Sequence, residues 1–186
     1  MKPHYYLVLA LGALLAAGCK KDDPEDGLPP ATQEGKNTGG CLVNGERFVA
    51  AESGGSLLTN PIPALRGGFA FDSVYYVSLN GTYQDQRATI MLFLRTRVAG
   101  TYMLNQTTQY YPQGSPRSVL NHATFTVAGA GGETYVTNLQ HTGQVVLTRM
   151  DKPVDISAGT FEFTAASTFD PSKTVTVTKG RFDRKQ

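Results

Sequence analysis

Histidine and carboxylate side chains carry much of the acid–base chemistry of proteins, and in this chain they show no shared pattern. The body of the chain has two histidines, His122 and His141, and neither belongs to an HExxH motif or stands beside a cysteine or carboxylate at metal-ligand spacing. The carboxylates are scattered, mostly beside turn residues, which favours solvated positions: Asp72, Asp85, Glu133, Asp151, Asp155, Glu162, Asp170 and Asp183. We therefore expect no catalytic residues, no metal and no cofactor. The alternative is a hydrolase whose site forms only in the tertiary structure, with His122 or His141 as its base.

Cys19 is the residue whose surroundings predict a definite chemistry. Lys2 precedes an uncharged run from Tyr5 to Ala17, and small residues lead from that run into Cys19. The run is shorter than the about 20 apolar residues of a membrane-spanning helix. A charged start, a short apolar middle and small residues at the end are typical of a secretory signal peptide.

The stretch LAAGC, residues 15–19, resembles the lipobox of bacterial lipoproteins, with Leu15 one place further from the cysteine than is usual. The resemblance implies that the Cys19 thiol receives a diacylglyceryl group and its freed amine a fatty acid such as palmitate, so the membrane is a partner through this lipid. Two chains anchor a protein stably where one does so only marginally. The following CKKDD looks like a signal for the outer face of the outer membrane, so we expect display on the cell surface rather than on the periplasmic face.

Composition divides the chain into three parts. Residues 1–18 form the predicted lipoprotein signal peptide, residues 19–40 a lipidated disordered tether rich in proline and glycine, and residues 41–186 a single domain. The formal net charge is +2 and no basic stripe is visible, so we expect no nucleic-acid partner. Cys41 is then the one cysteine left in the domain, and burial is a better explanation for it than reactivity.

The body of the chain predicts an all-β fold, an antiparallel β-sandwich or flattened barrel of about eight to ten strands. Asn44-Gly45 predicts a tight hairpin that pairs Cys41 with Phe48. Residues 159–164 and 174–183 alternate between apolar and polar side chains, with Phe161, Phe163, Val175 and Val177 directed inward. Phe182 has the opposite parity, so we predict a β-bulge near Lys179-Gly180 that returns it to the core.

Two stretches, LPPATQEGKNTGGCLVNGERF at residues 28–48 and GTFEFTAASTFDPSKTVTVTKGRFD at residues 159–183, resemble the opening and closing motifs of an uncharacterised family of bacterial lipoproteins. That family is known only as a domain of unknown function. The resemblance implies a lipoprotein address and a β-rich domain, and it carries no activity and no functional residues to this chain.

Tyr110 and Tyr111 are the candidate contact residues. They lie in a polar, proline-containing loop, residues 105–118, outside any clear strand pattern. Exposed tyrosines can stack against a sugar or anchor a protein, but one or both could instead fold back as a lid on the core. The sequence thus favours a non-catalytic lipoprotein that binds a glycan, a peptide or a protein, or that serves a structural role. A third hypothesis, a closed barrel around an apolar ligand, is disfavoured by the bulky residues expected inside.

Overall fold

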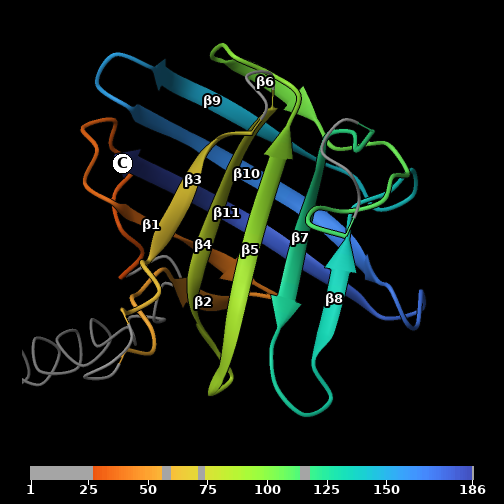
Figure 1. The fold of residues 1–186 in the computed structure, drawn as a ribbon. Helices are drawn as coiled ribbons and strands as arrows, with labels where there is room; N and C mark the ends of the chain where they lie inside the picture. The colour runs from red at the N-terminus through yellow and green to blue at the C-terminus, as the bar shows by residue number, and fades with distance from the viewer. Residues whose placement is uncertain (1–26, 56–59, 71–73, 114–117, 186) are drawn as a thin grey trace, which may run out of the picture.

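The computed structural model describes residues 27–55, 60–70, 74–113 and 118–185 and shows an all-β fold (Figure 1). Its strands are β1 (Thr38–Val43), β2 (Glu46–Val49), β3 (Leu65–Ala70), β4 (Val74–Tyr83), β5 (Gln86–Leu94), β6 (Gly100–Met103), β7 (His122–Val127), β8 (Glu133–Val136), β9 (Gly143–Asp151), β10 (Ile156–Ser167) and β11 (Thr174–Lys185). The predicted all-β antiparallel class is confirmed. Cys19 and the predicted signal peptide lie outside the described residues. In the part of the chain that is described, no helix has the length and apolarity needed to cross a membrane.

The strands form one antiparallel sheet that curls strongly into a half-barrel, which is nearer to the flattened-barrel alternative than to two packed sheets. Hydrogen-bonded neighbours follow the order β2-β1-β11-β10-β8-β7-β5-β4-β3. Strand β10 is long enough to have two neighbours on one side. Its residues 156–163 pair with β9, and its residues 166–167 pair with β8. Strand β9 also pairs with β6, so this pair branches off the main order of the sheet.

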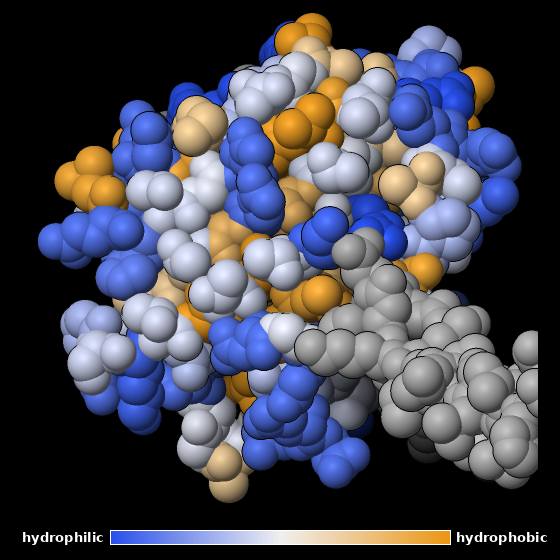
Figure 2. Space-filling model, turned by 180° about the vertical axis from the view of Figure 1, so that it is seen from behind, coloured by the Kyte–Doolittle hydropathy of each residue, from blue (hydrophilic) through white to orange (hydrophobic). Residues whose placement is uncertain are grey.

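The apolar core fills the inside of the curve. Alternate side chains of each strand point to opposite faces of the sheet, and the apolar ones take the inner face. Phe161, Phe163, Val175 and Val177 are buried, as predicted, and all four belong to the main core cluster. Figure 2 shows the outer face of the sheet, over the long strands β9–β11. The side chains on this face are mostly hydrophilic or of intermediate hydropathy, with apolar ones scattered among them. The sheet therefore has one apolar face and one face turned to solvent.

The predicted β-bulge is present in β11. From Val177 to Gly180 this strand advances by one residue more than its partner β10 does between the same pairs. Lys179 takes the extra place with a φ of 55°, a left-handed conformation that is uncommon for residues other than glycine. Phe182, downstream of the bulge, is 2% exposed and lies in the core. The bulge thus corrects the parity of the strand.

The predicted hairpin is confirmed at the other end of the chain. Asn44 and Gly45 have φ values of 50° and 83°, and Cys41 lies opposite Phe48 in the β1–β2 ladder. Both of these side chains are fully buried. Burial raises the pKa of the Cys41 thiol to about 12, so this cysteine is a small apolar core residue, as expected.

The predicted domain boundary at residues 40 and 41 requires correction, because the chain is already part of the fold before it. β1 begins at Thr38 and pairs with β11, and the segment 32–36 before it is bound by the Asp183 side chain. Thr32 donates its hydroxyl to Asp183 at 2.6 Å, and the backbone N–H groups of residues 34, 35 and 36 donate to the same carboxylate at 3.0, 2.7 and 3.2 Å. Asp183 is 1% exposed, so its expected solvated position is wrong as well.

We expect Asp183→Asn to lower the free energy of unfolding by about 2–3 kcal/mol, because the amide replaces a charged acceptor with a group that is half donor. Burial alone would raise the pKa of Asp183, but the Thr32 hydroxyl and the backbone amides together lower it. The stabilisation is therefore complete above the unfolded-state pKa of about 3.9 and is lost as the pH falls below it. Urea unfolding measured between neutral and strongly acidic pH should show the two proteins converging in acid.

Asp85→Asn is the matched control for this substitution. Asp85 lies in an exposed turn with a φ of 61°, a conformation that asparagine tolerates, so the change should alter stability by no more than about 0.5 kcal/mol. Equal effects of the two substitutions would show that the Asp183 carboxylate does not hold the N-terminal segment.

Candidate functional site

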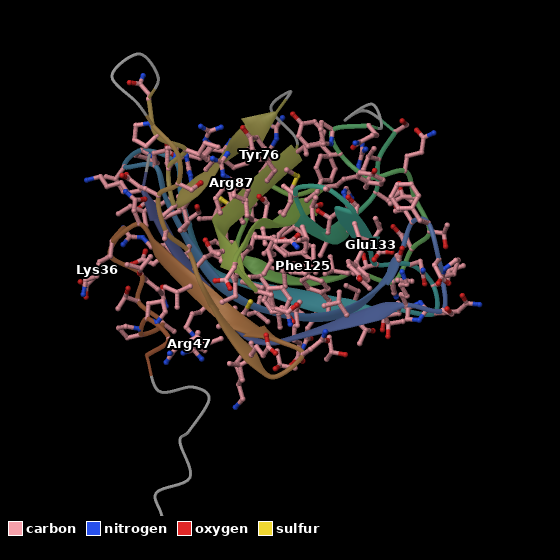
Figure 3. All side chains as sticks on the ribbon, turned by 90° about the horizontal axis from the view of Figure 1, so that it is seen from below. Lys36, Arg47, Tyr76, Arg87, Phe125 and Glu133 are labelled. Carbon is pink, nitrogen blue, oxygen red and sulfur yellow. The ribbon has the colours of Figure 1, made fainter. Side chains whose placement is uncertain are left out.

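A pocket of about 270 Å³ opens at one end of the half-barrel, where the β4–β5 and β7–β8 hairpins meet the start of β11. Its walls come from strands that are far apart in the sequence and that the curl of the sheet brings together. Figure 3 shows Phe125 and Glu133 within the curve of the sheet and Lys36 and Arg47 toward its outside. This pocket is the candidate site because reactive and aromatic side chains converge on it.

Three aromatic rings form the apolar part of the pocket. Phe125 is 1% exposed and forms the floor. The Tyr83 ring meets it edge to face, with 5.4 Å between the ring centroids, and Tyr135 lies at 6.2 Å on the neighbouring strand. Phe125 and Tyr135 are direct partners in the β7–β8 ladder, so their side chains share a face of the sheet. The arrangement leaves Tyr83 and Tyr135 as partly exposed walls.

Glu133 supplies a fixed negative charge at the rim. Its Oε2 accepts a hydrogen bond from the Tyr135 hydroxyl at 3.0 Å, and its Oε1 accepts one from the Ser167 hydroxyl. The Nζ atom of Lys173 lies 3.8 Å from Oε2. The Ser167 hydrogen bond is the main cause that lowers the pKa of Glu133, so the carboxylate is ionised at neutral pH. It is an acceptor held in one orientation.

The two tyrosine hydroxyls stay protonated under the same conditions, and the proton of Tyr135 is donated to Glu133 in a hydrogen bond. Burial and then the Glu46 carboxylate raise the pKa of Tyr83, and burial and Glu133 raise the pKa of Tyr135. Both hydroxyls therefore keep their protons. Gln84, at the mouth, donates from Nε2 to the Glu46 carboxylate at 3.1 Å. A ring face surrounded by fixed donors and acceptors can hold a small ligand that has both an apolar side and hydroxyl groups.

Tyr110 and Tyr111 lie outside this pocket and take two different positions. The Tyr111 ring stacks on Phe93 at 5.5 Å and lies 5.9 Å from Tyr76, in a small cluster separate from the main core. The lid alternative thus describes Tyr111. Tyr110 is partly buried and lines a separate hollow of about 200 Å³ with Thr108 and neighbouring residues.

The buried His122 fastens the tyrosine loop. His122 is the first residue of β7 and is 0% exposed. The backbone N–H of Tyr111 donates to its Nε2 at 3.1 Å, which assigns the proton to Nδ1, 2.8 Å from the Leu120 carbonyl oxygen. Burial lowers the pKa of His122 and favours the neutral ring. Both ring nitrogens are thus engaged with the backbone.

The second histidine also has a local partner. The backbone N–H of His141 donates to Oδ1 of Asn138 at 2.8 Å, and its Nδ1 lies 3.2 Å from the same atom. In these contacts neither histidine meets a carboxylate or a hydroxyl, which a base in the hydrolase alternative would need. Among the described residues, no group of three or more histidine, cysteine or carboxylate side chains is placed to hold a metal ion.

Sequence reasoning missed the residues of the pocket. It treated Glu133 as one of many scattered carboxylates. The spacing of Glu133 and Tyr135 on one strand face was visible, but their approach to Tyr83 requires the order of the strands β4, β5, β7 and β8.

Comparison with known proteins gives one match. A family model described as "Domain of unknown function (DUF6252)" matches residues 69–184, from β3 to β11, and so includes Tyr83, Phe125, Glu133 and Tyr135. No curated protein matches the chain, and no solved structure does. The comparisons therefore supply a family and no activity.

Proposed function

Since the chain belongs to this DUF6252 family of domains of unknown function, its role has to be inferred from its own residues, and we propose that it is a lipid-anchored, non-catalytic binding protein of the bacterial outer membrane. The domain stands on the cell surface and takes a hydroxyl-rich ligand, a glycan or part of one, in the pocket at the end of the half-barrel. The observation that carries the binding role is the convergence of Tyr83, Tyr135 and Glu133 over the Phe125 ring.

The anchoring part of the proposal is supported by the first residues of the chain. The short apolar run, the small residues before Cys19 and the lysines and acids after it follow the lipoprotein pattern. A diacylglyceryl group and an added acyl chain hold a protein at a membrane without a spanning helix.

The glycan part is supported by the chemistry and the size of the pocket. A sugar ring has an apolar face, which packs on an aromatic ring, and a rim of hydroxyls, which need fixed donors and acceptors. The pocket supplies the first with its rings and the second with the tyrosine hydroxyls and the Glu133 carboxylate. Its volume of about 270 Å³ lies just under the range of about 300–1,000 Å³ for drug-sized ligands, which suits a single ring.

Lipidation is tested by growing cells that express the full chain with radiolabelled palmitate. We expect the wild-type protein to take up the label and Cys19→Ser to lose it and leave the membrane fraction. Cys41→Ala is the control, because Cys41 is buried in the folded domain and its loss should leave labelling unchanged. An unlabelled wild-type protein would refute the anchor.

Ligand capture is tested with the full chain carrying Cys19→Ser, on an array of bacterial and plant glycans and then by titration calorimetry with the best ligand. We expect the double change Tyr83→Phe and Tyr135→Phe, which keeps both rings and removes both hydroxyls, to weaken binding about tenfold or more, since two hydrogen bonds contribute about 1–3 kcal/mol.

Tyr110→Phe is the matched control, because Tyr110 is a partly buried tyrosine outside the pocket. The Tyr110→Phe protein should bind the glycan as tightly as the protein with an unchanged pocket. Loss of binding in Tyr110→Phe alone would move the site to the loop, and the absence of any glycan ligand would refute the glycan role.

A further inference from the structure

A second and larger hollow, of about 590 Å³, lies where the free edge of the curled sheet approaches the end of β11. We propose that this hollow, the seam pocket, binds a small anionic ligand through a carboxylate or phosphate group. Its walls include Arg66 and Gly67 of β3 and Arg184 and Lys185 of β11. None of its lining residues belongs to the pocket described above. The two proposals can therefore fail independently.

Distance also separates the two sites. Val175 lines the first pocket and Arg184 the seam pocket, both on β11. At a rise of about 3.3 Å per residue, these positions on one strand are roughly 30 Å apart. A ligand in one pocket does not touch the other.

The charges of the seam pocket favour an anion. Arg66, Arg184 and Lys185 line it, and Glu52 is the one acidic residue among its described lining residues. Arg66 and Lys185 are exposed at the rim, whereas Arg184 is 3% exposed. Because charge-assisted hydrogen bonds are stronger where water is excluded, a buried guanidinium with two cations at the rim suits an oxyanion.

The Arg184 side chain is part of the wall of the seam pocket. Its Nη1 lies 3.4 Å from Oδ1 of Asp155, whose side chain is 44% exposed. The guanidinium has five donors in a planar fork, which matches the two oxygens of a carboxylate or phosphate. The surrounding fold holds the side chain in place while the rim stays accessible.

Glycine at position 67 makes room for this guanidinium. A Cβ atom at Gly67 would lie 3.1 Å from Cδ and Nε of Arg184 and 2.6 Å from the Tyr76 carbonyl oxygen. On the other side, the Asn37 side chain accepts the backbone N–H of Lys185 at 2.8 Å. Gly67 therefore leaves space for the Arg184 side chain, and Asn37 holds the backbone at Lys185.

The size of the hollow indicates the kind of anion. About 590 Å³ lies inside the range of about 300–1,000 Å³ for small-molecule sites, so it exceeds what a lone inorganic ion needs. The chemistry fits an organic acid or a phosphorylated small molecule whose acid group lies among Arg66, Arg184 and Lys185.

The test is titration of the full chain carrying Cys19→Ser with inorganic phosphate and, separately, with succinate, at constant ionic strength. We expect saturable binding of at least one probe and a rise in the melting temperature. The double change Arg66→Gln and Lys185→Gln should weaken binding about tenfold while leaving the unliganded protein folded, because both side chains are exposed. The probe that binds better identifies the acid group.

The double change Arg87→Gln and Arg97→Gln removes the same charge from two exposed arginines that do not line the seam pocket, and it should bind like the unmodified protein. Equal weakening in both double variants would show an effect of net charge alone and overturn the proposal. So would the absence of saturable binding of either probe, or stabilisation that sodium chloride reproduces.

Discussion

One extra residue in β11 sets the direction of every side chain that follows it. Before the bulge, Val175 and Val177 point inward; after Lys179, the same face is taken by Phe182. The same change of parity turns Asp183 toward the N-terminal segment and leaves Arg184 in the seam. Gly180 permits the close approach that the bulge requires, since a Cβ there would lie 2.5 Å from the Phe161 ring. The closing of the core, the docking of the chain start and the seam pocket thus share one local cause.

The curl of the sheet brings together the strands that form the pocket around Phe125. A single sheet of this kind brings its distant strands to the same opening, so β4, β7 and β8 together form the walls of one pocket around Phe125. Strand β11 extends from that pocket to the seam, β1 pairs along it, and Asp183 binds the segment 32–36 that precedes β1. The buried carboxylate is satisfied by donors from a part of the chain that composition alone would call a tether. This packing makes the start of the domain a structural element of the one sheet that carries both pockets.

Local chemistry was predictable from the sequence, and pairing between distant strands was not. The Asn44-Gly45 turn and the parity break before Phe182 each depend on a few neighbouring residues, and both predictions are confirmed. The burial of Asp183 and of His122 depends on partners in other segments, Thr32 in one case and Tyr111 in the other, and for Asp183 the neighbouring residues pointed to the wrong environment. The candidate pocket was missed for the same reason, because Tyr83 and Tyr135 meet only through the strand order. Cys19 lies outside the described residues, so its lipid stays a prediction from the residues around it.

The most direct measurement of the account is the stability of a protein that lacks Lys179, compared with Lys179→Gly, by urea unfolding. Deletion removes the extra residue and turns Phe182 outward, so we expect loss of cooperative folding. Lys179→Gly keeps the residue, and glycine suits its φ of 55°, so the free energy of unfolding should be equal or up to about 1 kcal/mol higher. A deletion variant as stable as the wild type would contradict the central claim that this bulge determines the fold.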